Sequence, residues 1–225
     1  MTQAVLEALA RVHDPELHAP VTTLGFVASC RVEEGRAEVR LRLPTYFCAP
    51  NFAFLMVADA YEAVAAVPGV REVRVVLEDH FAAEAINAGV AARAGFVDTF
   101  AGYAADELDQ LRTDFLRKAV LAGTDLVCRP LLAAGRRPEQ LVALDLGDLP
   151  PDPELLRLRA RRRELGLPAD DAAPLLVDVL TGQRVEPAAA ALHLRRARLT
   201  QVGVEANTSM CRGMLQHRYA TKEDA

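Results

Sequence analysis

The chain has 225 residues, enough for one domain or two with a substantial core, and about half of them are hydrophobic. No apolar run reaches the ~18 residues that a membrane span requires. The first residues, MTQAVLEALARV, lack the basic start and continuous apolar core of a signal peptide, so we expect a cytoplasmic protein without a membrane partner. The net charge is −5; residues 1–98 hold 13 acidic and 8 basic side chains, residues 99–225 hold 18 of each, and neither part suits a nucleic-acid binder.

Two features of the composition bear on the kind of site to expect. The four cysteines are too sparse and too widely spaced for a disulfide framework or a CxxC zinc site: Cys30, Cys48, Cys128 and Cys211. The arginine-rich segment around Arg162, RLRARRREL, has acidic flanks and no interleaved aromatic residues. It therefore indicates a solvated helix face rather than a phosphate-binding patch.

The first third of the chain predicts a small sheet domain. Residues 3–12 space their apolar side chains by three and four, which predicts a short helix that ends before Pro15. From Leu24 to Leu43 the apolar period is two, with Glu34-Gly35 as a two-residue turn in the middle, which predicts a β-hairpin with one buried face that includes Cys30.

A second helix and a third strand complete this domain. Residues 51–67 predict a helix that is apolar nearly all round, so we expect the sheet to cover one side and either the C-terminal half or another subunit to cover the other. Residues 73–77 then supply a third strand. The order α-β-β-α-β predicts a three-stranded α+β domain over residues 1–82.

Beyond residue 82 the β pattern fades and helical patterns follow. We expect helices at residues 81–94, 104–122, 153–165, 187–199 and 205–217, with loops at 147–153 and 167–174. Residues 83–225 are thus predicted to be a mostly α-helical extension that recognises a client or partner.

The segment Leu43–Phe54, LPTYFCAPNFAF, is the first candidate for chemistry. It places Cys48 in a proline-flanked turn just before a predicted helix, where unpaired N–H groups and the helix dipole favour a thiolate. A thiolate binds metals or acts as a nucleophile, whereas the alternative is a thiol packed in the core.

The second candidate is the loop after the first helix, where Asp14, Glu16 and His18 alternate with other residues. If the loop is extended, the three side chains lie on one side and form a set that suits iron or zinc. The alternative is that Asp14 caps a helical turn with Pro15 at its first position.

The third candidate is His80, just past the third strand, a place where a single histidine is more often a surface or capping residue. The loop after the first helix and the ends of the second and third strands can meet at one edge of a small sheet. We therefore predict a transient metal site for one iron, with zinc as an alternative, from Cys48, Asp14, Glu16, His18 and His80.

Several short motifs in order make the N-terminal region similar to a known family. They are Asp14-Pro15-Glu16, Leu24-Gly25-Phe26-Val27, Thr45 three residues before Cys48, and Pro68-Gly69-Val70 leading into Val73-Arg74-Val75. Over roughly residues 3–82 the chain resembles the SufT/PaaD-like family of metal–sulfur cluster assembly factors. The resemblance implies an α+β fold, delivery of iron or iron–sulfur clusters to client proteins, a reactive cysteine at Cys48 and an acidic loop at Asp14 and Glu16.

The chain departs from the family pattern at two places. Ala49 separates Cys48 from Pro50, where the family has proline directly after the cysteine, and His80-Phe81 stands near the place of a common tryptophan. A cluster needs several thiolates. One monomer offers only Cys48 in this region, so the mixed set suits a single ion better.

The longer members of this family resemble accessory proteins encoded beside bacterial multicomponent diiron monooxygenases. That weaker resemblance implies a maturation factor that helps a carboxylate-bridged diiron subunit fold or take up iron. The client metalloprotein would then be the main partner, and a homodimer is left open by the apolar faces of residues 51–67.

The C-terminal segment NTSMCRGMLQHRY holds another cysteine and histidine. Cys211 and His217 are six residues apart, about 240° of rotation on a helix, so they cannot chelate one ion together. Met210 and Met214 form a stripe that indicates core or a partner face. Cys211 could join Cys48 if this segment folds back on the N-terminal domain, and we expect Cys128 to be buried.

Three functions are compatible with these patterns. The first is a non-enzymatic metallochaperone, and the second is a metal-free scaffold that docks a partner near Tyr61. The third, an enzyme with Cys48 as nucleophile and His80 or His13 as base, has no oxyanion device or hydrolase motif in its favour.

Overall fold

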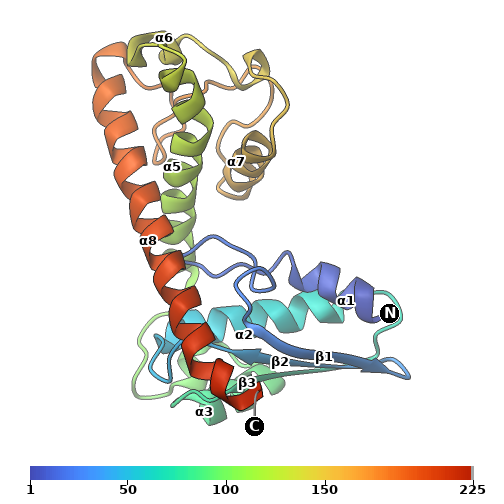
Figure 1. The fold of residues 1–225 in the computed structure, drawn as a ribbon. Coiled ribbons are helices and arrows are strands. Elements are labelled where there is room, and N and C mark those ends of the chain that lie inside the picture. Colours follow the sequence, from blue (N-terminus) through green and yellow to red (C-terminus); the bar gives the residue numbers. More distant parts are fainter. Residues whose placement is uncertain (224–225) are drawn as a thin grey trace. The chain divides into compact units, whose positions relative to one another are not determined.

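The structure, a computed structural model, describes residues 1–223 (Figure 1). They form two compact units. The first consists of residues 1–110 together with the end of the chain from Asn207, and the second of residues 111–206. The predicted boundary after residue 82 falls inside the first unit, because the next helix and the end of the last helix both pack on the N-terminal core.

The first unit is built on a β-hairpin. Strand β1 (Val27–Glu33) pairs antiparallel with β2 (Arg36–Arg42). Glu34 and Gly35 join them with φ of 47° and 80°, the positive values that a two-residue turn of this kind needs, so the hairpin is confirmed.

Strand β3 (Glu72–Glu78) completes a three-stranded sheet in the order β1-β2-β3. It lies parallel to β2, with Val39 opposite Val75, and helix α2 (Pro50–Ala65) makes the crossover between them. With helix α1 (Thr2–Leu9) in front, the observed order is α-β-β-α-β, as expected. The predicted α+β domain followed by a mostly helical part is confirmed.

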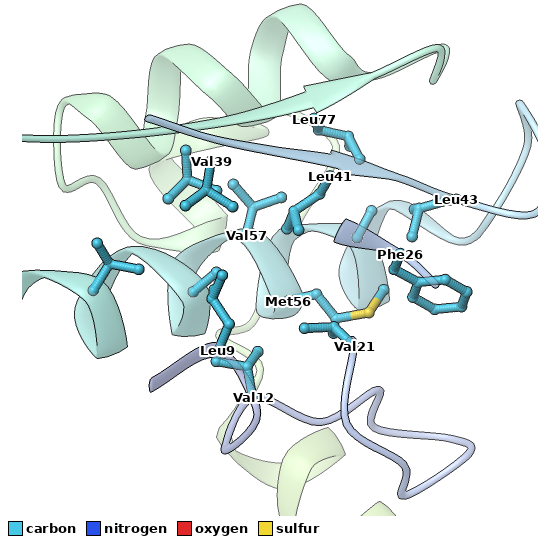
Figure 2. Close-up of a cluster of buried hydrophobic side chains, with 14 of the residues drawn as sticks. Leu9, Val12, Val21, Phe26, Val39, Leu41, Leu43, Met56, Val57 and Leu77 are labelled. Carbon is cyan, nitrogen blue, oxygen red and sulfur yellow. The ribbon is translucent and has the colours of Figure 1, made fainter. Parts of the chain in front are cut away.

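The core of this unit lies between the sheet and helices α1 and α2 (Figure 2). Alternate residues of β2 point into it: Ala37, Val39 and Leu41 are almost completely buried, as is Leu43 just after the strand. Leu9 and Val57 meet them from the helices. Each such side chain contributes about 1.5–3 kcal/mol relative to an exposed one.

Helix α2 is covered on its second side by other helices of the same unit. It packs on α1, on β3 and on helix α3 (Ala83–Ala91). The cover expected from the C-terminal half is supplied in part by α3, which belongs to the predicted extension of residues 83–225, and cover by another subunit stays a prediction. Asn87 of α3 also hydrogen-bonds both backbone groups of Leu77, at 2.8 and 3.0 Å, and so closes part of the outer edge of β3.

Strand β1 begins later than the alternation predicted, and its register changes between Val27 and Ser29. Leu24 and Phe26 are buried before the shift, whereas Ala28 is exposed. A one-residue irregularity moves side chains to the opposite face. Cys30 consequently lies half-buried at the border of the core rather than inside it.

The second unit is helical. Its elements are α5 (Asp109–Ala133), α6 (Pro138–Val142), the 3₁₀ turns Leu146–Asp148 and Pro187–Ala189, α7 (Pro153–Glu164) and the first part of α8 (Ala190–Glu223). A short helix α4 (Phe96–Thr99) precedes α5 in the first unit. The core of the second unit includes Cys128, Leu141 and Leu176, all fully buried, which confirms the expectation for Cys128.

The prediction of a solvated arginine face is wrong for Arg162, which is buried. Its side chain is fully buried, and it donates hydrogen bonds to the carbonyl oxygens of Pro174 at 2.8 Å and Leu175 at 2.6 Å. Burial lowers its pKa to about 10. Neighbouring Arg163 is exposed, so the segment has one solvated side and one arginine that holds the loop of residues 167–175.

The two helices expected at residues 187–199 and 205–217 form the single helix α8. Gly203 weakened the pattern between them, but the helix continues through it with no neighbour near the place of a Cβ. Within residues 1–223, no helix has the length and apolarity to cross a membrane.

Candidate functional site

Cys48 lies in the turn between β2 and α2. Pro50 is the first residue of α2, and Ala49 before it is extended, with φ −57° and ψ 127°, as a residue preceding proline prefers. Cys48 therefore stands one residue outside the helix cap, half-buried at the border of the core. The family's cysteine and proline are separated here without loss of the helix start.

Thr45 connects the backbone of this turn to the sulfur. Its Oγ1 accepts a hydrogen bond from the backbone N–H of Phe47 at 3.2 Å and lies 3.3 Å from Sγ of Cys48. In the contact between Thr45 and Cys48 either the hydroxyl or the thiol can donate.

His80 holds the same turn from the end of β3. Its side chain is 4% exposed, its Nε2 lies 2.7 Å from the carbonyl oxygen of Cys48, and its Nδ1 accepts from the N–H of Ala82 at 3.2 Å. These partners place the proton of the neutral ring on Nε2. Burial lowers the pKa of His80, although the Cys48 carbonyl opposes this, and the charge of Arg218 lowers it further.

His80 is thus a neutral ring with both nitrogens engaged by the backbone. In this arrangement it positions the turn that carries Cys48. To bind a metal it would have to give up one of these hydrogen bonds.

Asp14 caps a helical turn instead of lying in an extended loop. Its Oδ1 accepts from the N–H groups of Glu16 and Leu17, both at 2.8 Å, and the N–H of His18 donates to its carbonyl oxygen. The cap that the sequence offered as the alternative is therefore present, and the alternation of an extended loop does not apply. Burial raises the pKa of Asp14 to about 6, although its two backbone hydrogen bonds oppose the rise.

Glu16 points to the other end of the chain. Its Oε1 accepts a hydrogen bond from Nδ2 of Asn207 in α8 at 3.1 Å. His18 ends the turn with φ of 53°, a left-handed conformation. The loop thus brings Glu16 to α8 and uses Asp14 to hold its own backbone.

The last turns of α8 carry a second cysteine to this region. Leu215 and Tyr219 are buried in the core of the first unit, and Cys211 packs at its border. Burial and, less strongly, the negative charges of Asp14, Cys48 and Glu16 together raise the pKa of the Cys211 thiol to about 11. His217, the other candidate of this segment, is exposed.

The structure relates four of the five predicted site residues to one another. Cys48 and His80 share one hydrogen bond, and the charges of Asp14, Cys48 and Glu16 all act on Cys211. Among residues 1–223, no three or more His, Cys, Asp or Glu side chains stand together in a way that could hold a metal ion. Coordination of one ion by the five predicted residues stays a prediction.

Three residues that contact the predicted site residues or their turns were not among the predicted ligands. Thr45 had a local signal in the sequence, its place three residues before Cys48. Asn207 and Arg218 come from more than 125 residues away, and no local pattern indicates their contacts. An exposed aromatic group also borders Cys48. Tyr46 is 47% exposed, Phe47 77% and Phe81 49%, with ring centroids 5.0 to 6.3 Å apart.

The first unit has the order α-β-β-α-β with Cys48 in the turn before its second helix, and its N-terminal part is similar to known proteins of iron–sulfur cluster assembly. The model of a family described as iron-sulfur cluster assembly protein matches residues 2–75, which include Asp14, Glu16 and Cys48. The family resemblance seen in the sequence is thereby confirmed for this region. His80 and Cys211 lie outside it.

A curated relative agrees with the family match. The iron-sulfur cluster carrier protein of Deinococcus radiodurans is 35% identical over 75 residues, which are 33% of this chain and 21% of the carrier. The match thus spans about a fifth of the relative's length. No solved structure matches this chain.

Proposed function

We propose that this protein assembles or delivers iron–sulfur clusters or iron for a client metalloprotein, and that Cys48 is the side chain that takes up the cargo. The observation that carries the proposal is the turn of Cys48, in which Thr45 contacts the sulfur and His80 holds the carbonyl oxygen, within the region matched by the assembly family. A role as carrier rather than enzyme fits the family and the relative.

Uptake at Cys48 is a ligand exchange. The thiol loses its proton, and the sulfur forms a bond to iron. Delivery reverses the step when a ligand of the client replaces Sγ and Cys48 regains a proton. Half-burial of Cys48 suits both steps, since the sulfur is held in place and remains open to a partner.

The aromatic group of Tyr46, Phe47 and Phe81 supplies a docking surface for the client next to the cargo. Large exposed aromatic side chains are typical anchors of protein interfaces. Phe47 precedes Cys48 directly, so a client bound there would have the sulfur within reach.

Each kind of metal cargo would suit a different kind of client protein. Mononuclear iron would suit a carboxylate-bridged diiron monooxygenase as client, whereas a cluster would suit an iron–sulfur client, and zinc would compete for the same thiolate. The cytoplasmic location and the homodimer expected from the sequence stay predictions.

Anaerobic loading with ferrous iron and sulfide tests the proposal. Wild type, Cys48→Ala and the matched control Cys30→Ala are desalted, and iron and sulfide per chain are measured. We expect Cys48→Ala to retain less than a fifth of the wild-type iron and Cys30→Ala to retain all of it. Equal, negligible iron in wild type and Cys48→Ala would refute the proposal.

A metal-free scaffold is the second candidate, and the engaged nitrogens of His80 and the capping carboxylate of Asp14 favour it. It predicts that Cys48→Ala leaves client maturation intact. Substitutions near Tyr61, whose ring is stacked by Arg93 at 5.7 Å, would then abolish maturation.

A further inference from the structure

The C-terminal part of α8 is fastened to the first unit on both sides of Cys211. Before it, Asn207 donates to Glu16 at 3.1 Å. After it, Arg218 donates to the carbonyl oxygens of Leu43, at 3.0 Å, and of Asp79. These carbonyls belong to the segments that lead into Cys48 and His80.

The spacing along α8 shows which way Cys211 faces. Asn207, Cys211 and Leu215 follow one another at intervals of four, so they lie on one face of the helix. Asn207 meets Glu16, and Leu215 approaches Gly25 so closely that a Cβ there would lie 3.2 Å from Cδ2 of Leu215. Cys211, between them, therefore faces the segment that runs from Asp14 to Gly25.

The surroundings of Cys211 include Cys48. Both cysteines pack at the border of the same hydrophobic core, and the charges of Cys48, Asp14 and Glu16 act on the Cys211 thiol. The helix contacts place Cys211 against the segment from Asp14 to Gly25, and two turns further along α8 Arg218 donates to the carbonyl oxygen of Leu43, five residues before Cys48. The shared core and the effect of the Cys48 charge agree with this placement.

We propose that Cys211 is the second thiolate ligand of the cargo, which it holds together with Cys48. The inference rests on the proposed function and deepens it, because the family match ends at residue 75 and assigns nothing to α8. The two thiols release their protons to water, the two sulfurs replace two water ligands of the iron, and the iron keeps its oxidation state. Thiolate pairs select iron and zinc over harder cations.

Two protein ligands leave other positions of the metal open. A structural site would close all four positions, whereas a carrier must let the client's ligands replace its own. The carboxylates of Asp14 and Glu16 give the region the negative charge that attracts a divalent cation.

Cobalt(II) titration under anaerobic conditions tests the pair, because the sulfur-to-cobalt charge-transfer band grows with the number of thiolates bound. The proteins are wild type, Cys48→Ser, Cys211→Ser, the double variant and the control Cys30→Ser, each checked for an unchanged thermal transition. We expect each single variant of the pair to lose half of the band or more, the double variant to lose all of it, and Cys30→Ser to match wild type.

The outcomes separate the inference from the proposed function. If Cys48→Ser loses the whole band and Cys211→Ser matches wild type, the inference is overturned and the proposed function stands. If Cys48→Ser also matches wild type, both are overturned.

A trivalent phenylarsenical provides a second measurement that needs no variant. Its two hydroxyl groups leave as water when two neighbouring thiols bond to arsenic. In the folded wild type we expect one arsenical per chain, joining the Cys48 and Cys211 peptides in mass spectrometry. Modification that joins other cysteines, or none, contradicts the pair.

Discussion

At the scale of single residues, the turn of Cys48 is held by groups that are already engaged with the backbone. Oγ1 of Thr45 accepts from the N–H of Phe47 and contacts Sγ of Cys48. The two ring nitrogens of His80 bond to the carbonyl oxygen of Cys48 and the N–H of Ala82. Asp14 does the same in its own turn. The distinction between a ligand and a positioning residue can therefore be tested by substitutions that keep the hydrogen bond and remove the ligand.

His80 is the first such case. We expect His80→Ala to destabilise the protein by about 1–3 kcal/mol, because the half-buried carbonyl of Cys48 and the buried N–H of Ala82 lose their partner. His80→Gln, whose amide can donate to the same carbonyl, should recover part of that loss in urea unfolding. Cobalt binding that survives in His80→Gln indicates positioning, whereas complete loss in this stable variant indicates a ligand.

Asp14 is the second case. Asp14→Asn keeps the capping oxygen and removes the buried charge, so we expect it to be at least as stable as wild type in urea at pH 7. Asp14→Ala should lose about 1 kcal/mol, the usual value of such a cap. Equal losses in both variants would argue against the cap, and weaker cobalt binding in Asp14→Asn alone would reveal the charge's role in metal uptake.

At the scale of elements, the end of α8 and the loop around Gly25 depend on each other. Gly25 has φ of +78° and faces Leu215, so its lack of a side chain serves both the turn and the approach of the helix. Gly25 lies within residues 2–75, which the family model matches, whereas Leu215 in α8 lies outside them.

Gly25→Ala tests this dependence. We expect a loss of about 1–2 kcal/mol in the free energy of unfolding from the left-handed backbone, with a further loss from the contact with Leu215. When Leu215 is replaced by Ala, the part of the loss that comes from the contact with Leu215 should disappear. A double-mutant cycle measured by urea unfolding should therefore show coupling between the two positions. Strict additivity would mean that Leu215 does not press on Gly25.

At the scale of the whole molecule, the chain forms two units with separate cores, and α8 contributes to both. Ala190 and Leu194 belong to the core of the second unit, whereas Leu215 and Tyr219 belong to that of the first. The candidate site lies in the first unit. The second unit has titratable groups of its own, so the stability of the two units should respond differently to pH.

His193 makes that difference measurable. Burial lowers the pKa of His193 below its usual 6.5, and the charges of Arg162 and Arg196 lower it further, although Asp178 opposes them. Below pH 6.5 the unfolded chain therefore binds more protons than the folded one, and stability falls as the pH falls. Hydrogen exchange at pH 7 and 5.5 should show α8 residues 190–200 losing protection in wild type and less so in His193→Gln.

Local patterns in the sequence were sufficient for the sheet domain. Glu34-Gly35 between two alternating runs is enough for a hairpin, and Pro50 at a helix start is enough to place Cys48 outside the cap. The pattern failed where a single residue changed the register, at Ala28, and where Gly203 interrupted a helix that continues. It also could not distinguish buried Arg162 from exposed Arg163, because adjacent residues look alike until the opposing loop is known.

The sequence by itself therefore determined the α+β class, the turn of Cys48 and the similarity of residues 2–75 to an assembly family, since each depends on residues close together in the chain. Tertiary structure decided what surrounds Cys48. It engaged both nitrogens of His80, paired Glu16 with Asn207 and brought Cys211 from α8 to the loop of Glu16. Contacts between residues 160 or more positions apart arise from packing of a continuous helix on a core, and no local pattern in the sequence carries that information.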